Sequence, residues 1–180
     1  DVLQTKTHRV KEHLALFALL EAPCYFVSGN HDLWYGAKEL EKILISYGLN
    51  SLENKKELIT LKNQTIQLAG LSDRYSRFYG VKRPIKELFA SLDRELPTIL
   101  LIHQPKDIKL LKDERVDLVL AGHTHGGQIY PFHLLTKLVQ PYMSGLYQVK
   151  NRTLFVNRGV GYWGVPIRYK ADSEVAVITL

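Results

Sequence analysis

The stretch from Gly122 to Gln128 reads Gly-His-Thr-His-Gly-Gly-Gln and places two histidines one residue apart. It directly follows the largely apolar run 116–121, whose length and composition are typical of a buried strand. In an extended chain His123 and His125 would share one face, whereas a turn, which the three glycines permit, would splay them. Neutral imidazole is a common metal ligand, so the pair is a candidate metal site. A glycine-rich connection with two surface histidines is the alternative interpretation.

Two other apolar runs also lead into residues of metal-binding type. The run 24–27 precedes Asn30 and His31, and the run 98–102 ends at His103. A single strand-end histidine is more often a hydrogen-bonded structural residue, but three such ends in one chain favour a site. Imidazole nitrogens with amide and carboxylate oxygens suit Mn, Fe, Zn, Ni or Co. The chain has no thiolate cluster, which argues against a structural zinc site.

The elements that must position these residues follow from the spacing of apolar residues. Helical spacing predicts helices over four segments: 7–20, 37–47, 84–92 and 107–112. Short apolar or alternating runs predict strands over eight segments: 24–27, 58–61, 65–70, 98–102, 116–121, 146–149, 153–157 and 174–180. The stretches 73–83 and 129–144 are predicted to be irregular. Helix and strand alternate first and strands dominate later, which predicts two packed sheets with helices outside.

Composition sets the broad class of the protein. A chain of 180 residues with 46% hydrophobic content has enough core for one globular domain. The single cysteine, Cys24, excludes a disulfide framework. The formal charge of +6 suits an anionic ligand. The basic residues are scattered rather than gathered in a stripe, so no nucleic acid is expected as a partner.

The order and spacing of three motifs resemble the calcineurin-like metallophosphoesterases. The motifs are Gly29-Asn30-His31-Asp32, Ile102-His103-Gln104 and Gly122-His123-Thr124-His125. The residues that follow, Gly126-Gly127-Gln128, with Arg158-Gly159-Val160-Gly161 and Pro166-Ile167-Arg168, resemble the bacterial branch typified by the YkuE and YaeI phosphoesterases. The resemblance implies a metallo-dependent phosphatase-like fold, a four-layer α/β/β/α sandwich of two mixed sheets, as a single domain over residues 1–180.

The resemblance also implies a dinuclear centre of two divalent metal ions. Asn30, His103 and His123 would bind one ion, and His125 would bind the other. Asp1 lies 29 positions before Asn30, close to the family's spacing for the carboxylate that bridges the two ions. The family's Asp-x-His motif is not found before Asn30, so the second ion would keep only Asp1 and His125 as protein ligands.

The implied reaction is hydrolysis of a phosphomonoester, phosphodiester or pyrophosphate by a hydroxide that the two ions activate. Attack on phosphorus is in line, so no serine or cysteine nucleophile is needed. By the same resemblance His31 stands beside the leaving-group oxygen as a general acid, and Asp32 holds its ring in position. The substrate is a phosphoester, with lipid-linked and nucleotide-linked compounds both open.

The missing motif is expected to reflect an N-terminal truncation that removes the first β-α units. We expect upstream residues or a second polypeptide to fill the gap, and the missing region to be a route to membrane association. A catalytically impaired binding or scaffold module on the same fold is the alternative. The branch implies a bacterial source and a place in the cytoplasm, at the membrane or in the envelope. The oligomeric state stays open.

Four further features keep two interpretations each. Trp34 and Tyr35 either wall the pocket or pack in the core, and Tyr162 with Trp163 forms either a substrate-facing flap or a core plug. Arginines at 74, 77 and 168 either pair with substrate phosphate or are solvated surface charges. The basic, aromatic loop 75–83 either contacts lipid headgroups or is an ordinary exposed loop.

Overall fold

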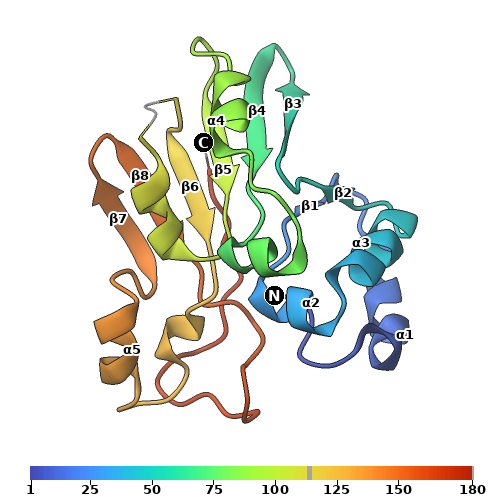
Figure 1. The fold of residues 1–180 in the computed structure, drawn as a ribbon, viewed down its shortest axis with the longest axis vertical. Coiled ribbons are helices and arrows are strands. Elements are labelled where there is room, and N and C mark those ends of the chain that lie inside the picture. Colours follow the sequence, from blue (N-terminus) through green and yellow to red (C-terminus); the bar gives the residue numbers. More distant parts are fainter. Residues whose placement is uncertain (113–114, 180) are drawn as a thin grey trace.

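The computed structural model describes residues 1–112 and 115–179. It contains a six-stranded sheet and a two-stranded sheet with helices packed outside them, and the expected α/β class with two sheets is confirmed (Figure 1). The larger sheet has the order β3-β4-β5-β6-β8-β7. Its strands are β3 (Lys55–Leu61), β4 (Gln64–Gly70), β5 (Thr98–Leu101), β6 (Leu118–Ala121), β7 (Gly145–Val149) and β8 (Arg152–Val156).

The larger sheet is mixed, with a parallel centre and antiparallel edges. Strands β4, β5, β6 and β8 run parallel to one another, while β3 and β7 pair antiparallel with their neighbours. Alternate residues of β5, β6 and β8 are buried, as expected for strands with one face on the core. The parallel centre matters because carboxyl ends of parallel strands meet at one edge.

The smaller sheet differs from the expectation of two mixed sheets. It consists of β1 (Tyr25–Phe26) and β2 (Asn50–Ser51), which pair in parallel. Helices α2 (Asn30–Tyr35) and α3 (Ala37–Ser46) connect the two strands. Within the described residues this sheet has only two strands and therefore one pairing, so it cannot be mixed.

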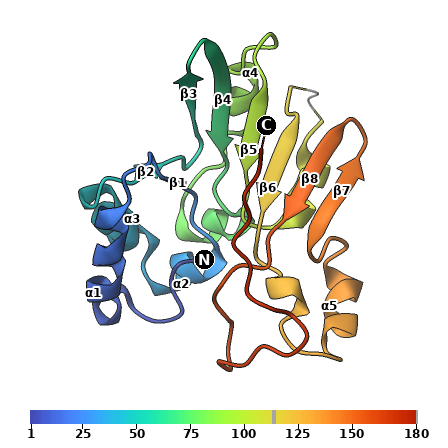
Figure 2. The same ribbon diagram turned by 180° about the vertical axis from the view of Figure 1, so that it is seen from behind.

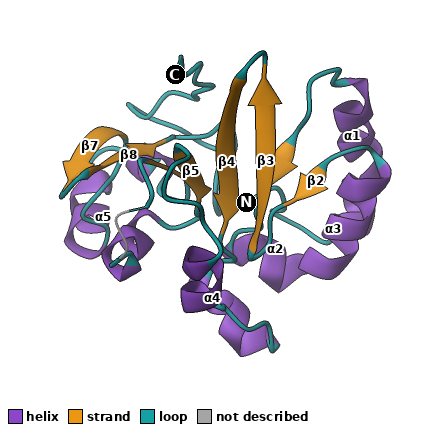
Figure 3. Ribbon diagram, turned by 90° about the horizontal axis from the view of Figure 1, so that it is seen from above, coloured by secondary structure: helices purple, strands orange, loops and turns teal. Residues whose placement is uncertain are grey.

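Two hydrophobic cores hold these elements together. The larger lies between the six-stranded sheet and α4 (Ile85–Ala90), which covers one face (Figure 3), and it includes Ile108 of η4 (Pro105–Leu110). Viewed from behind, the C-terminal segment crosses the opposite face of the same sheet (Figure 2). The smaller core joins α3 to the N-terminal segment through five buried leucines: Leu3, Leu14, Leu40, Leu44 and Leu49.

The helix predicted over 7–20 is wrong as one element. The structure divides it into η1 (Thr7–Arg9), α1 (Lys11–Leu14) and η2 (Ala15–Leu19). Leu16, Leu19 and Leu20 are 64%, 75% and 53% exposed. Their apolar side chains gain little from packing, so tertiary contacts do not stabilise a continuous amphipathic helix.

The C-terminal strand predicted over 174–180 is also wrong for its described part. Residues 171–179 pair with no strand in the described chain, and Val175 and Val177 are 83% and 94% exposed. Leu180 lies outside the described residues. A strand needs a neighbouring ladder to satisfy its backbone groups, and alternation alone does not supply one.

Three segments predicted as irregular or overlooked are helical. They are α2, η3 (Arg74–Tyr79) within the predicted loop, and α5 (His133–Val139) within the predicted irregular stretch. The apolar residues of α5 have helical spacing, but Leu138 and Val139 remain 82% and 68% exposed. No helix in the described ranges is long and apolar enough to cross a bilayer.

Core packing predicts a sharp contrast between two leucines of the larger sheet. Leu100 in β5 is fully buried, whereas Leu58 in β3 is 58% exposed. Leu100→Ala should lower the free energy of unfolding by about 2–5 kcal/mol, because it removes transfer energy and leaves a cavity. Leu58→Ala, the control, should change it by less than about 1 kcal/mol. Urea denaturation followed by circular dichroism measures both; equal losses would contradict this assignment of the core.

Candidate metal centre

The candidate residues meet where β5 and β6 end. Ile102 donates its backbone N–H to Leu120 (3.0 Å), and Gly122 donates to the carbonyl oxygen of His103 (3.1 Å). These bonds continue the parallel ladder past both strands. The connections after β5 and β6 therefore start at the same level and at the same edge of the sheet.

The connection after β6 is a tight turn in which the histidines themselves adopt left-handed backbone. The φ angles of His123 and His125 are 72° and 50°, and Gly126 and Gly127 also have positive φ. The turn therefore splays the two imidazoles, which in an extended strand would have shared one face. Left-handed backbone at non-glycine residues costs about 1–3 kcal/mol each and persists where surrounding contacts enforce it.

The third contribution comes from Gly29 and the start of α2. A Cβ atom at Gly29 would lie 2.0 Å from Asp1 Oδ1 and 2.5 Å from His103 Cε1. Only glycine allows the backbone to approach these side chains so closely. Asn30 follows as the first residue of α2 and is 3% exposed.

Four potential ligand atoms surround one point. His103 Nε2 lies 3.1 Å from Asn30 Oδ1, 3.1 Å from His123 Nδ1 and 3.2 Å from Asp1 Oδ2. The ligand atoms of Asp1, His103 and His123 all lie within 4.8 Å of one another. The side chains of Asp1 and His103 are each 4% exposed. The structure thus brings together the four residues expected at the first ion.

Burial keeps these imidazoles neutral. Desolvation is the main reason why the pKa of His103 falls well below its ordinary value and that of His123 falls to about 2. Burial also lowers the pKa of His125 to about 4, with the Arg168 guanidinium adding to the effect. Metal ligation requires deprotonated imidazole nitrogen, so the site holds its histidines in the form that a cation needs.

The donor set passes a simple test of fit to a cation. Atoms that share an ion at about 2.1 Å are themselves about 3.0–3.4 Å apart when the ligand–metal–ligand angle is about 90–109°. The separations around His103 Nε2 fall in this range. The amide and carboxylate oxygens only accept hydrogen bonds, and the two imidazoles are neutral. The cluster is therefore rich in lone pairs that face one another and suits a borderline divalent ion.

His125 lies apart from this cluster and faces an arginine. Its Nδ1 is 3.3 Å from an Nη atom of Arg168. The same guanidinium donates to backbone carbonyls at Arg158, Gly159, Gly161 and Ala171. Its donors are thus occupied by the loop that follows β8, and the interpretation of Arg168 as a free partner for substrate phosphate is wrong. Arg168 instead links that loop to His125 through these hydrogen bonds.

His31 lies at the mouth of the centre, but a different residue holds its ring. The Nδ1 of His31 is 2.9 Å from Gln4 Oε1, and Trp34 stacks on the imidazole with centroids 4.5 Å apart. Asp32 was expected to hold this ring. Its carboxylate instead accepts from the backbone N–H groups of Gly29, Val2 and Leu3 at 2.7–2.8 Å. That expectation is wrong because Asp32 lies in the first turn of α2, where backbone donors compete for a carboxylate.

A cavity of about 430 Å³ opens over the centre. Asp1, Asn30, His31, His123 and His125 line its polar side. Rings and aliphatic side chains form the rest, including Trp34, Tyr75, Leu135, Val139 and Trp163. Trp34 and Trp163 therefore face the cavity rather than the core, and Tyr35 and Tyr162 are not among the lining residues.

The residues that support the ligands were not indicated by any motif in the sequence. Gln4 contacts the His31 ring, and Gln104, next to His103, donates to both oxygens of the buried Asp73 carboxylate at 2.9 and 3.1 Å. Asp73 also caps the start of η3, because its side chain accepts from the backbone N–H of Tyr75, a residue that lines the cavity. The position of Gln104 directly after the strand-end His103 could have indicated its supporting role. No comparable feature of the sequence pointed to Gln4.

Comparison with known proteins matches the part of the chain that contains Asn30, His103, His123 and His125. Residues 3–127 match the family model described as calcineurin-like phosphoesterase. An uncharacterized metallophosphoesterase of Helicobacter pylori (strain J99) is 38% identical over 100% of this chain and 49% of its own length. The transmembrane protein with metallophosphoesterase domain of Danio rerio is 37% identical over 87% of the chain and 38% of its own length. The uncharacterized metallophosphoesterase YkuE of Bacillus subtilis is 32% identical over 86% and 54%. The chain spans about half the length of these relatives, or less. They come from both bacteria and animals.

The cluster predicts a specific dependence of metal binding on His123. His123→Ala should reduce bound Mn²⁺ or Zn²⁺ at least tenfold, because it removes one of the lone pairs around His103 Nε2. His13→Ala, which changes an exposed histidine of α1, should leave metal content unchanged. Elemental analysis after dialysis against a limiting concentration of metal gives the ratio of metal to protein. Equal metal content in the two variants would show that the cluster is not the binding site.

The lowered pKa of His123 predicts a pH-dependent stability of the metal-free protein. The unfolded imidazole titrates near its ordinary value of 6.5, whereas the folded one titrates at about 2. Between these values the unfolded chain binds more protons, so stability is full above about pH 6.5 and falls as the pH decreases toward 2.

Unfolding in urea at pH 7 and pH 4.5, with chelator present, measures this loss. His123→Gln lacks the titrating group and should lose less stability over the same interval than the parent. An equal loss in parent and variant would show that His123 does not titrate in this way.

Proposed function

The chain belongs to the calcineurin-like phosphoesterase family, and we propose that it carries the metal centre of a phosphoester hydrolase. The observation that carries the proposal is the convergence of Asp1, Asn30, His103 and His123 around one point beneath an open cavity. Their role as metal ligands is our inference from donor chemistry and spacing. His125, on the same cavity wall, is assigned to a second ion, and Asp1 to the bridge between the two.

Divalent cations at such a centre draw charge from phosphoryl oxygens and activate water as a nucleophile. The chain's own contribution is to hold the ligand side chains in fixed positions. The left-handed turn holds His123, the β5–β6 ladder holds His103, and the helix start holds Asn30. Cys24, the one cysteine of the chain, is partly buried against the smaller core and does not line the cavity over the centre.

His31 is the proposed proton donor to the leaving group. In the free protein, burial lowers its pKa, so the ring is neutral near pH 7. A ring protonated at Nδ1 donates to Gln4 Oε1 and leaves Nε2 as the second titrating atom. A bound anionic phosphoester favours the charged ring and raises the pKa again. The imidazolium then donates from Nε2 while Gln4 keeps the ring oriented.

The cavity walls favour a substrate with an apolar or aromatic part. Trp34 and Trp163 are 49% and 57% exposed, and Leu135 is 62% exposed, all beside the ligand cluster. A nucleobase would stack on such rings, and an acyl or prenyl chain would pack on the aliphatic side. Both nucleotide-linked and lipid-linked phosphoesters therefore belong in the substrate panel, as mono-, di- and pyrophosphate esters.

One observation favours a second candidate function, a binding module without turnover. Arg168 lies against His125, and a guanidinium at that position repels a second cation. Within the described residues the group of three ligand atoms includes His103 and His123 but not His125. A protein that binds one metal per chain and hydrolyses no member of the panel would match this second function.

Replacement of His31 tests the first function directly. His31→Ala should lower kcat by roughly 10²–10⁴ on an alkyl phosphoester, because the poor leaving group needs a proton. On a nitrophenyl ester, whose leaving group is stable as an anion, the loss should be much smaller. His13→Ala is the matched control and should retain full activity on both substrates.

Metal content of His31→Ala should equal that of the parent, since the ring is outside the ligand cluster. Steady-state kinetics on both esters and elemental analysis of the same samples provide the readout. Equal losses on the two esters, or loss of metal, would remove His31 from the proton-transfer role.

A further inference from the structure

A second cavity of about 430 Å³ shares η3 with the cavity over the metal centre. Tyr75 of this segment lines the metal-centre cavity, whereas Arg74 and Arg77 line the second one. We call this second space the arginine cavity, after its lining by Arg74, Arg77, Gly80, Val81, Lys82, Arg83 and Leu110. It is not part of the ligand cluster described above.

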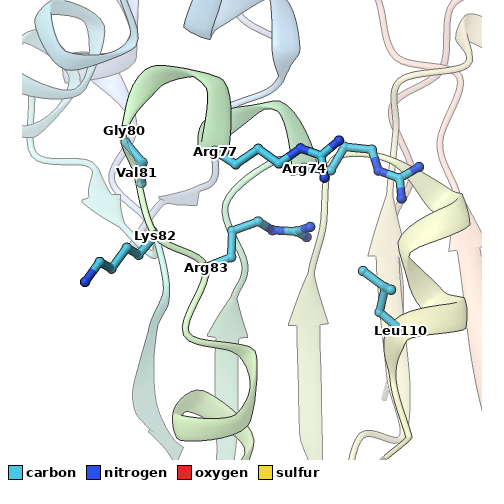
Figure 4. A pocket seen from close by; sticks show the side chains of 7 residues that line it. All are labelled: Arg74, Arg77, Gly80, Val81, Lys82, Arg83 and Leu110. Carbon is cyan, nitrogen blue, oxygen red and sulfur yellow. The ribbon is translucent and has the colours of Figure 1, made fainter.

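The arginine side chains extend across this cavity in one direction. Figure 4 shows Arg74, Arg77 and Arg83 directed toward the side of the cavity that Leu110 borders. Lys82 extends the opposite way, although it belongs to the same loop. Three guanidinium groups are thus gathered at one place, while the lysine charge is directed elsewhere.

A buried carboxylate fixes two of these groups. Arg83 donates to Asp107 Oδ2 at 2.5 Å, and Arg74 Nε lies 3.3 Å from Asp107 Oδ1. The side chain of Asp107 is 2% exposed and that of Arg83 is 12% exposed. The two guanidinium groups are therefore oriented before any ligand arrives, which lowers the entropic cost of binding.

The cluster has more positive charge than its carboxylate neutralises. Three guanidinium groups face the Asp107 carboxylate and the nearby Asp73 carboxyl, so a net charge of at least +1 remains. Arg77 has no ion-pair partner among residues 1–112 and 115–179 and contacts the Phe78 ring, 4.6 Å from the centroid. Asp73 accepts hydrogen bonds from Gln104, and burial raises the pKa of its carboxyl.

Lys106 adds a further positive charge near Arg74. Burial lowers the pKa of this lysine, and the positive charge of Arg74 lowers it further. Like charges crowded in this way cost free energy that a bound anion would recover.

We propose that the arginine cavity binds a phosphate group distinct from the one at the metal centre. Guanidinium is the side chain best suited to paired hydrogen bonds with phosphate oxygens, and three of them face one space. Two sources share this chemistry: a soluble phosphate compound and the headgroup of an anionic phospholipid. Phe78 and Tyr79, beside the cavity, are 66% and 47% exposed and would meet the interface in the second case.

Two variants of the same loop make the test specific. Arg77→Gln removes a guanidinium that points into the cavity, and Lys82→Gln removes an equal charge that points away. Inorganic phosphate is titrated into metal-free, chelator-treated protein and followed by ³¹P NMR. Arg77→Gln should weaken binding about tenfold or more, and Lys82→Gln less than about twofold. No turnover is involved, so a protein without hydrolase activity would still answer the question.

Vesicles of phosphatidylglycerol and phosphatidylcholine form the second arm, read by co-sedimentation with the same two variants. Loss of vesicle binding in Arg77→Gln alone, without phosphate binding by the parent, identifies a headgroup as the source. Phosphate binding that Arg77→Gln weakens identifies a soluble compound. Binding of neither probe would overturn the proposal. Equal losses in Arg77→Gln and Lys82→Gln would also overturn it, since the net positive charge of the loop would then explain the binding.

Discussion

The contact on which the centre depends is the close approach of the Gly29 backbone to Asp1 and His103. A side chain at position 29 would overlap both groups, because its Cβ would lie only 2.0 Å from one and 2.5 Å from the other. The start of α2 fits against the end of β5 only because that space is free. Asn30 then reaches His103 Nε2, and Asp32 folds back to satisfy the amide of Gly29 itself. Because Gly29 has no side chain, the helix that follows the smaller sheet can pack against the larger sheet at the metal centre.

Around this contact, electrostatics and backbone geometry act in the same direction. Burial removes protons from the imidazoles, and the turn after β6 uses left-handed backbone at His123 and His125 to aim them apart. Both features cost stability in the absence of a ligand. A bound cation would recover part of that cost, since it pairs with lone pairs that otherwise face one another. At His125 a cation would recover less of this cost, because the guanidinium of Arg168 already lies against the imidazole.

Sequence patterns predicted the part of the site that follows from strand ends. Apolar runs before Asn30, His103 and His123 indicate strands, and the parallel ladder of β5 and β6 brings the last two to one edge. The role of each residue in metal binding stays a prediction. The bond from His31 to Gln4 and the fastening of His125 by Arg168 were not predictable, because each depends on a contact between distant loops.

The fold divides in the same way. The central strands of the larger sheet, β4, β5, β6 and β8, were indicated by apolar runs within about two residues of their observed bounds, since their burial and their local pattern agree. The exposed edge strand β3 was predicted three residues too short at its start. Segments whose pattern and burial disagree were mispredicted. Helical spacing at 7–20 did not give one helix, and alternation at 174–179 gave no strand, because few of these side chains pack against anything. The expectation of one domain over residues 1–180 stays a prediction.

Anomalous X-ray diffraction from crystals soaked in Mn²⁺ would locate a cation bound by this cluster. We expect a peak at about 2.0–2.3 Å from Asn30 Oδ1, His103 Nε2 and His123 Nδ1. A second, weaker peak beside His125 would add the dinuclear centre, and its absence would favour one ion per chain. If crystals that bind Mn²⁺ elsewhere show no peak within reach of His103 and His123, these residues are not metal ligands.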